Sequence, residues 1–334
     1  MYNLNHYDYI IIGAGLAGCV AARELTDRGA KCLVVEKRDH IGGNCASYMA
    51  GDIEVHKYGP HIFHTNKKEL WDYVNRFDDW NEYYHQVKSL YNNKMYDFPP
   101  NINVLKDLCN TIKATPKAKK KIYEAFFEGY TAKAWFNEKP PFDPMARIPI
   151  KITTDNHYWP DTYQGLPGFG YDNFFNEMLT GIDRILGVTL QPMPFDEPKI
   201  IMSGRADDMF NCSEGVLKFK GVRFDTNVIP LTHVQGFASL NFAKANNPAL
   251  RQMEWKYFTG GTVEKTDYTV ITNEYADKKG EDYPYPTKKY INMHKKYAEM
   301  AEERGIVLIG RLGLYRYMNM DQTIESTLEI IGNL

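Results

Sequence analysis

The sequence has few of the features that hold nucleic acids, structural metals or membranes. Among its 334 residues, 40 lysines and arginines stand against 42 aspartates and glutamates, so no positive excess exists to hold nucleic acid or an anionic membrane. The five cysteines are scattered without a CxxC or CxxH spacing, which argues against a structural zinc site. No apolar run approaches a membrane span or resembles a secretory signal. We therefore expect a cytoplasmic protein without membrane insertion.

Aromatic residues, in contrast, are abundant. They form 14% of the chain, and 24 residues are tyrosines. Tyrosine suits a binding site that needs apolar ring faces together with a hydrogen-bonding tip. The chain is also longer than a single core usually organises, so we expect two or three subdomains.

The stretch from Tyr7 to Arg38 predicts a dinucleotide-binding βαβ unit. Apolar runs at 7–12 and 32–35 predict buried parallel strands, and a helical pattern between them continues to about residue 28. The glycine fingerprint and the acidic residue that ends the second strand are Gly13, Gly15, Gly18 and Glu36. The glycines permit a tight turn, a close pyrophosphate and a closely packed helix, and the carboxylate can accept from a ribose hydroxyl.

A basic pair and a glycine pair follow this unit. Lys37 and Arg38 precede an Ile-Gly-Gly-Asn run that contains Gly43 and Asn44. In flavoproteins of the glutathione-reductase type, a motif with paired glycines stands at this place, which favours FAD over NAD. The alternative is a flexible turn without a ligand.

Three histidines gather in the stretch HKYGPHIFHT at 56–65. Their spacing could reach one metal ion, but the run contains no carboxylate or cysteine to complete a ligand set. A glycine–proline turn interrupts the run, which indicates a loop directed at a ligand. We therefore expect His61 and His64 to contact a cofactor and expect no metal.

The middle of the chain is predicted to be helical and then strand-rich. Residues 101–135 have a helical pattern broken at Pro116, and 82–98 form a hairpin around an Asn-Asn turn. Residues 137–149 read as a long loop, a class that includes lids. Further helices are predicted at 66–77 (capped by Thr65 or Asn66), 170–179, 290–304 and 321–331, and strands at 148–154, 199–203, 216–224, 234–242, 253–258, 268–273 and 306–309.

Taken in order, these pieces resemble one family, the bacterial UDP-galactopyranose mutases. The resemblance extends from about Tyr7 to Ile331. The most specific pieces are the histidine run and the final arginine–tyrosine motif. The matching segments are GAGLAG, VVEKR, HIGGN, HKYGPHIFHT, GYTAKAW, RIPIKITTDNHY, YQGLPGFGY, NFAKANNPALR and IGRLGLYRYMNM.

The resemblance implies an FAD enzyme, an isomerase that interconverts the pyranose and furanose forms of a UDP-sugar. The flavin must be reduced, with NAD(P)H or another reductant as electron source, although the reaction is redox-neutral. In this family the reduced flavin N5 attacks the anomeric carbon, UDP leaves, and a flavin–sugar iminium recloses to the other ring. UDP-galactopyranose to UDP-galactofuranose is the expected conversion, which serves cell-surface polysaccharide biosynthesis.

The resemblance also assigns roles to residues. Arg147 and Arg251 match the two diphosphate arginines, which without the family would read as ordinary surface arginines. His61 and His64 match the pair beside the flavin. The remaining flavin positions are Arg311, Tyr317 and Asn319, and the uridine, sugar and phosphate positions are Phe126, Tyr130, Thr131, Trp135, Tyr158, Asn241, Tyr285 and Tyr317.

Three departures from the family pattern bear on these expectations. The helical segment before GYTAKAW, which supports dimer contacts in the family, is short here, so the homodimer stays open. His85 stands where the family has an asparagine near the sugar, and Asn319 replaces an acidic residue. UDP-arabinopyranose and UDP-N-acetylgalactosamine therefore stay open as substrates. From other classes, a flavin amine oxidase or dehydrogenase of the same fold and a non-catalytic nucleotide-sugar binder remain alternatives.

The expected fold is α/β, with a Rossmann-like FAD-binding domain, a small helical domain and an antiparallel sheet that carries the substrate site. We assign residues 1–80, 164–214 and 305–334 to the first domain. Residues 101–147 form the helical domain with its lid loop. Residues 81–100, 148–163 and 215–304 form the substrate domain.

Overall fold

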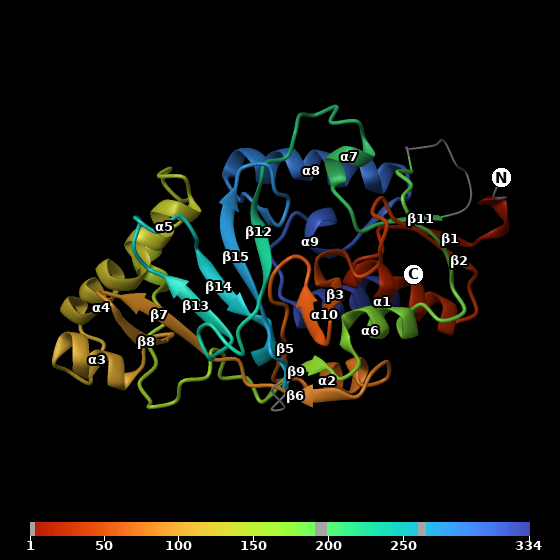
Figure 1. The fold of residues 1–334 in the computed structure, drawn as a ribbon. Helices are drawn as coiled ribbons and strands as arrows, with labels where there is room; N and C mark the ends of the chain where they lie inside the picture. The colour runs from red at the N-terminus through yellow and green to blue at the C-terminus, as the bar shows by residue number, and fades with distance from the viewer. Residues whose placement is uncertain (1–3, 191–198, 260–264) are drawn as a thin grey trace.

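A parallel sheet occupies one end of the computed structural model, which describes residues 4–190, 199–259 and 265–334 (Figure 1). Its strands follow the order β10-β2-β1-β11-β17 and are all parallel. Their bounds are Asp183–Ile185, Cys32–Val35, Tyr9–Ile12, Lys199–Met202 and Val307–Leu308, respectively. The predicted strand at 199–203 therefore returns to the first sheet, beside β1, as expected.

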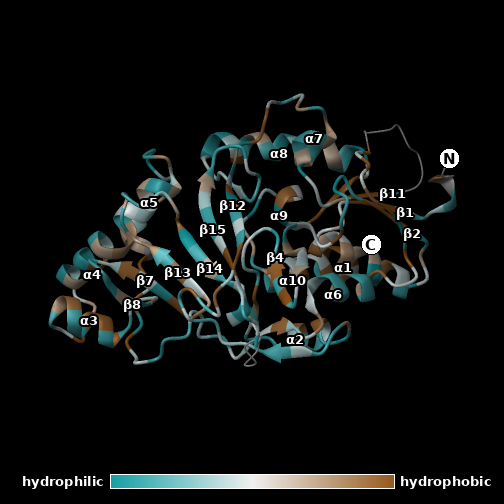
Figure 2. Ribbon diagram, in the orientation of Figure 1, coloured by the Kyte–Doolittle hydropathy of each residue, from teal (hydrophilic) through white to brown (hydrophobic). Residues whose placement is uncertain are grey.

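Both faces of this sheet are buried, which explains its continuous apolar strands (Figure 2). Ile11, Val34 and Ile201 pack on one face with helices α1 (Leu16–Asp27), α6 (Gly170–Met178) and α10 (Met320–Gly332). On the opposite face, Ile200 and Met202 join a core with helices α7 (Ala206–Met209) and α8 (Lys288–Glu303). The predicted βαβ unit is thus confirmed in β1, α1 and β2.

A second, seven-stranded sheet runs through the middle of the molecule in the order β16-β12-β15-β14-β13-β7-β8 (Figure 1). Its strands are Tyr283–Pro284, Phe219–Ile229, Thr269–Asp277, Arg251–Glu254, Ser239–Phe242, Val87–Tyr91 and Lys94–Phe98, respectively. All neighbours are antiparallel except β13 and β7, which are parallel. The expected antiparallel sheet is therefore mixed, because β7 comes from a distant segment whose direction no hairpin fixes.

Short helices cover the β7–β8 end of this sheet. They are α3 (Ile102–Cys109), α4 (Pro116–Ile122), a π-helical turn (Tyr123–Phe127) and α5 (Glu128–Ala134). Their core includes Val87, Phe98, Leu105 and Ile122. The turn residues Asn92 and Asn93 both have positive φ, at 49° and 60°, as a two-residue hairpin requires. The predicted hairpin and the break at Pro116 are confirmed.

Two small sheets join the larger parts. One pairs β3 (Ser47–Ala50) with β4 (Ile53–His56), and the other has the order β5-β9-β6. The strands of the second are Phe63–Thr65, Tyr163–Pro167 and Trp80–Glu82. Helices α2 (Lys68–Val74) and α9 (Gly310–Gly313) complete the fold. Over the described ranges, no helix is both long and apolar enough to cross a bilayer.

Three local predictions were wrong. Residues 148–154 form no strand: Pro149 has no amide hydrogen to donate, and two isolated backbone bonds, from Lys151 to Pro100 and from Ile102 to Thr153, replace a ladder. Strand β14 ends at Glu254, and a 3-10 turn over Trp255–Tyr257 follows. Helix α2 has Lys67 as its N-cap residue instead of Thr65 or Asn66, since the Asn66 side chain bonds to Asp161 and Thr162.

Candidate active site

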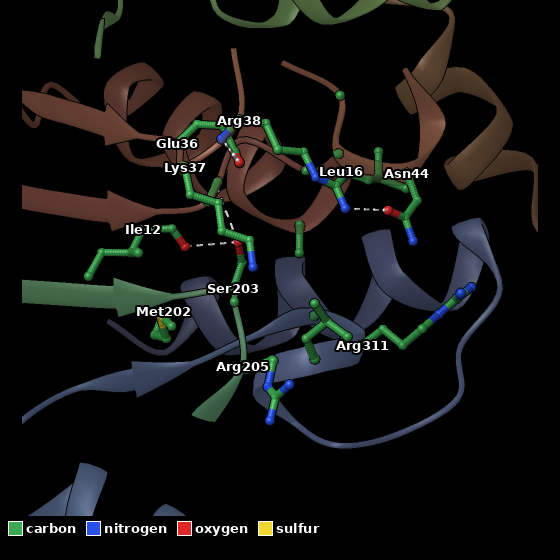
Figure 3. A pocket seen from close by; sticks show the side chains of 18 of the residues that line it. Ile12, Leu16, Glu36, Lys37, Arg38, Asn44, Met202, Ser203, Arg205 and Arg311 are labelled. Atoms are coloured by element: carbon green, nitrogen blue, oxygen red, sulfur yellow. Dashed lines mark hydrogen bonds between the residues drawn. The ribbon is translucent and has the colours of Figure 1, made fainter. Parts of the chain in front are cut away.

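A cavity opens at the carboxyl ends of the parallel strands, where open α/β sheets bind their ligands (Figure 3). Glu36, Lys37 and Arg38 border it after β2, and Arg205 and Arg311 approach from the opposite side. Of the predicted cofactor residues, those that line the cavity are Gly13, Gly15, Glu36, Lys37, Arg38, Gly43, Asn44, His61 and Arg311. Gly18, Tyr317 and Asn319 do not line it.

The glycines of the fingerprint make a backbone cradle. Gly13 has a φ of +102°, and a Cβ added at Gly43 would lie 2.8 Å from the Cα of Gly15. A Cβ on Gly18 would lie 1.9 Å from the carbonyl oxygen of Gly13, so the helix and the turn pack in direct backbone contact. Side chains at these places would push these backbone segments apart and open the cradle that a pyrophosphate needs.

Glu36 anchors this cradle and keeps capacity for a ligand. Its carboxylate, on a residue only 6% exposed, accepts hydrogen bonds from the backbone amides of Ala14 at 2.7 Å and Arg38 at 2.8 Å. An ionised carboxylate offers about four acceptor sites. Glu36 can therefore hold the turn and still accept from ribose hydroxyls.

Cationic side chains surround the cavity. The Arg38 guanidinium donates to the Asn44 side-chain oxygen at 3.0 Å (Figure 3), and Arg311 donates to the carbonyls of Asp282 and Met318 at 3.2 and 2.7 Å. These bonds fix the cations at the cavity wall. The glycine cradle, the ribose acceptor and the positive side chains together fit a dinucleotide diphosphate such as that of FAD.

His61 reaches the cavity as a neutral imidazole. Its Nδ1 lies 2.9 Å from the carbonyl oxygen of Gly59, and a carbonyl only accepts, so Nδ1 carries the proton and Nε2 a lone pair. Burial, with help from His56 and Arg311, lowers the pKa of His61 to about 3. This residue is therefore a hydrogen-bond acceptor at Nε2 near neutral pH.

His64 does not join His61 at the cavity. Its Nδ1 lies 2.6 Å from Asp161, and its ring stacks on Trp159 at a centroid distance of 4.2 Å. Successive residues of a strand point to opposite faces, and on β5 the Phe63 side chain packs in the main core while His64 faces Asp161. The two predicted flavin histidines thus have different surroundings.

A row of side chains crosses the second sheet. The directly opposed residues Asn241, Arg251, Glu274 and Phe224 stand on strands β13, β14, β15 and β12, respectively. Opposed residues project from the same face of a sheet. The sheet therefore places Asn241 beside Arg251 and Arg251 beside Glu274.

Arg251 is the charged centre of this row. Its Nε donates to the nearly buried Glu274 carboxylate at 2.6 Å. Burial alone would lower the pKa of Arg251, but Glu274 and nearby tyrosines outweigh it, so the guanidinium stays charged. Its charge also acts on the pKa values of Tyr130, Tyr158 and Tyr283.

These three tyrosines come from separate segments of the chain. Desolvation raises the pKa of each hydroxyl, to about 12 for Tyr283, and the Arg251 charge opposes the rise. The hydroxyls therefore remain protonated donors near neutral pH. The Arg251 charge also contributes slightly to lowering the pKa of His61 at the cofactor cavity.

A second aromatic group lies beside the first. The Trp135 ring lies 5.4 Å from that of Tyr285, and the Lys220 ammonium lies 4.1 Å over the Trp135 ring. Burial lowers the pKa of Lys220 to about 8. In the described part of the chain, no carboxylate lies within ion-pair distance of this lysine. Tyr317 is exposed and stacks on Tyr283 at 5.8 Å.

Comparison with known proteins identifies the family. The UDP-galactopyranose mutase profile matches residues 125–317, and that of NAD(P)-binding Rossmann-like domains matches residues 11–77. The first match covers more than half of the chain. The chain belongs to the UDP-galactopyranose mutase family. Accordingly it is an isomerase of the pyranose–furanose mutase type with an FAD-binding Rossmann-like domain.

Individual relatives agree with this family. A probable UDP-galactopyranose mutase of Klebsiella pneumoniae is 30% identical over 98% of this chain and 94% of the relative. A dTDP-fucopyranose mutase of Escherichia coli is 29% identical over 96% of each chain. The crystal structure of a reduced UDP-galactopyranose mutase matches with a TM-score of 0.76 and 16% identity, covering 98% of this chain and 95% of that one.

Several positions that the family resemblance assigned lie outside the Arg251 cluster. Phe126 is 2% exposed and packs in the helical core against Tyr91 and Tyr96. Asn319 caps helix α10 in a reciprocal pair with Gln322. The side chain of Arg147, at the end of the 3-10 turn Pro144–Arg147, lies outside the described part of the structure.

The remaining assigned positions stand closer to the cluster. His85 is buried, its Nδ1 lies 2.9 Å from the Tyr83 hydroxyl, and burial with the Arg251 charge lowers its pKa to about 3. Thr131 follows Tyr130 on α5 and is half-buried. The centroid of the His85 ring lies 6.0 Å from that of Tyr158 and 5.8 Å from that of Trp159.

Sequence reasoning missed three residues near Arg251 and Trp135, namely Glu274, Lys220 and Tyr283. Glu274 and Lys220 stand in strands and gave no motif of their own, and only strand register brings them beside Arg251 and Trp135. Tyr283 stands two residues before Tyr285, which family resemblance assigned, and was not itself assigned. The sequence held one signal for Glu274, because side chains alternate between the two faces of a strand and Glu274 therefore shares a face with Thr272. Thr272 contacts Thr226 across the sheet.

Proposed function

We propose that this chain is a UDP-galactopyranose mutase that interconverts UDP-galactopyranose and UDP-galactofuranose. The observation that carries the proposal is the position of Arg251, held by Glu274 and surrounded by Tyr130, Tyr158 and Tyr283, within electrostatic reach of His61 at the cofactor cavity. A nucleotide-sugar diphosphate that leaves and returns needs such a cation near the reacting carbon.

The cofactor contributes the bond-forming chemistry. FAD, when bound and reduced, supplies the electron-rich nitrogen that bonds to the anomeric carbon of the sugar. The glycine cradle at 13–18, Glu36 and Arg311 hold it at the ends of the parallel strands. His61 would offer the bound cofactor the Nε2 lone pair as an acceptor, and its low pKa keeps that atom unprotonated.

The nucleotide half is held by the cluster on the second sheet. Arg251 neutralises the charge that develops on the diphosphate, and Glu274 fixes the guanidinium in place. The protonated tyrosine hydroxyls donate to phosphate oxygens. We propose that Arg147 adds a second cation when the loop at 137–147 closes as a lid, and that Asn241 and Trp135 contact the uridine and sugar.

A second candidate substrate is suggested by His85, which family resemblance places near the sugar. The His85 ring lies among Tyr158, Trp159 and Phe258, an apolar lining that suits a methyl group better than a hydroxymethyl group. A dTDP-fucopyranose, whose sugar carries that methyl group, is therefore the second candidate, and the Escherichia coli relative acts on it by name. UDP-arabinopyranose and UDP-N-acetylgalactosamine complete the set to test.

Fold likeness alone also admits a flavin oxidase. Structures of putrescine oxidase match with TM-scores of 0.57 and 0.59 at 11% and 10% identity, a similarity that extends to the fold only. An arginine among tyrosines gives an amine substrate no counter-charge, which argues for the mutase. Oxygen consumption with amines would favour the oxidase.

The deciding experiment incubates the FAD-loaded protein with each candidate nucleotide sugar, with and without dithionite. NMR of the products then reports the ring form. We expect conversion of UDP-galactopyranose only with reduced flavin. Failure to convert any of the four sugars, or equal conversion with oxidised flavin, would contradict the mutase. UDP binding without any turnover would instead identify a nucleotide-sugar binder.

A further inference from the structure

Lys133 on helix α5 is a half-buried cation with an unusual set of partners. Its ammonium donates to the carbonyl oxygens of Phe242 at 2.7 Å and Ala249 at 2.6 Å. No carboxylate lies within ion-pair distance of it in the described ranges. Burial lowers its pKa to about 8. Holding a charge here without a counter-ion costs free energy, so a local benefit must offset it.

The two carbonyls mark the base of one connection. Phe242 follows Asn241 at the end of β13, and Ala249 stands just before β14, which begins at Arg251. The backbone amide of Phe242 also donates to the Leu250 carbonyl at 2.9 Å. Lys133 thus closes the loop between Asn241 and Arg251 from the helix side.

Gly129 makes a second contact between α5 and the same loop. A Cβ at this position would lie 2.6 Å from the carbonyl oxygen of Ala243 and 2.8 Å from the amide nitrogen of Ala245. Residues four apart on a helix share one face, so Gly129 and Lys133 form one continuous contact. The helix backbone therefore rests on the loop without intervening side chains.

The adjoining face of α5 carries a residue of the nucleotide cluster. Tyr130 follows Gly129, and the Arg251 charge acts on its hydroxyl. The distance between the tyrosine on the helix and the arginine on the strand is thus set by how α5 seats on the loop. Tyr130 and Arg251 are far apart in the sequence, so the packing of α5 on the sheet brings the two groups together.

We propose that Lys133 is a positioning residue that locks α5 onto the β13–β14 loop and so fixes Tyr130 against Arg251. It touches neither cofactor nor substrate. The inference rests on the proposed function, because it assigns the Arg251 cluster to the nucleotide diphosphate. Its consequence is that UDP affinity depends on a lysine that UDP never contacts.

The test measures UDP binding by calorimetry on FAD-loaded protein, so it needs no turnover. Lys133→Met keeps the aliphatic stem but removes the donors, and we expect UDP affinity to fall about tenfold or more, as losses of charged hydrogen bonds do. In the reduced-flavin assay, KM should rise more than kcat falls. Lys117→Met, on the exposed side of α4, is the matched control and should bind UDP normally.

Gly129→Ala is the second variant, since its methyl group would push the helix off the loop without touching Lys133. We expect weakened UDP binding again, with normal flavin content. A double variant that combines Lys133→Met with Arg251→Lys should lose less UDP affinity than the product of the two single losses. Both changes affect the placement of Arg251 against Tyr130. Multiplicative losses would overturn the positioning role.

The two proposals fail in different ways. If wild-type protein binds UDP and both Lys133→Met and Gly129→Ala bind it equally well, the positioning role is wrong and the proposed function stands. A lowered melting temperature with unchanged UDP affinity would give Lys133 a purely structural role and overturn the inference. If wild-type protein neither binds UDP nor converts any sugar, both proposals fail.

Discussion

Asn241 and Arg251 stand directly opposite each other on β13 and β14, at the two ends of one loop. A single hairpin therefore presents an amide and a guanidinium on the same face, and Glu274 on the next strand secures the guanidinium. Arg251 is therefore the side chain of this hairpin that we propose binds the diphosphate.

Replacing Arg251 with alanine should cost about 3 kcal/mol of transition-state stabilisation, roughly a hundredfold in kcat/KM, as for other groups that stabilise developing charge. Steady-state kinetics with dithionite-reduced protein give this value. Arg223→Ala is the matched control, because that arginine is exposed and stacks on Tyr275. A near-normal rate for Arg251→Ala would remove the diphosphate assignment.

UDP affinity should decline as pH rises through about 8, where Lys220 loses its proton. In the unfolded chain this lysine keeps its proton up to the ordinary pKa of 10.5. Between about pH 8 and 10.5 the unfolded chain therefore binds more protons, so the free energy of unfolding rises with pH. Over the same range the site around Trp135 loses a positive charge. Calorimetric UDP titrations across this range measure the effect. Lys220→Met should bind UDP more weakly and flatten the decline; a decline of the same size in the variant would exclude Lys220 as its source.

Acid should destabilise the protein through buried histidines. Burial lowers the pKa values of His56, His61 and His85 from 6.5 to about 3. Between those values the unfolded chain binds protons that the folded protein does not, so each histidine removes up to about 1.4 kcal/mol of stability per pH unit as pH falls. Thermal unfolding of His56→Gln at several pH values should show a shallower acid loss than wild type. The exposed His233→Gln should show none of this relief.

Gly18→Ala should abolish FAD binding, because the added methyl group would overlap the Gly13 carbonyl and force the cradle open. Flavin absorbance of the purified protein measures the loss. Gly332→Ala, at a position with nothing within 4 Å of the added Cβ, is the matched control and should keep its flavin. A yellow Gly18→Ala protein would show that the helix tolerates a wider separation from the turn.

The local elements of the fold followed from sequence patterns because local forces determine them. The βαβ unit, the Asn92–Asn93 hairpin and the helix at 170–178 rest on glycine positions, turn residues and apolar periodicity. The prediction of a strand at 148–154 was wrong because it gave the β-branched residues there more weight than Pro149. The parallel pairing of β7 with β13 could not be predicted, since no pattern in either strand encodes its distant partner.

Site residues that belong to sequence motifs could be predicted, whereas those placed by the pairing register of distant strands could not. Most predicted cavity residues came from the glycine fingerprint and the basic and glycine pairs that follow it, whereas Arg311 and Arg251 came from family resemblance. Glu274 and Lys220 stand in no recognisable motif, and Lys133 lies in the GYTAKAW segment without a role assigned to it; their places follow from strand register and from the packing of α5 on the loop. Phe126, which family resemblance assigned to the substrate site, is a buried residue of the helical core.

The parallel pairing of β7 with β13 also constrains the order in which the sheet can fold during synthesis. The hairpin at 87–98 and the helices on it can assemble from nearby contacts, but β7 pairs with Ser239–Phe242, which leaves the ribosome much later. Until then one edge of β7 stays unpaired, a state that invites association with other chains. A nascent or truncated chain ending before residue 239 would carry that open edge, and chaperone dependence should be greatest at that stage of translation.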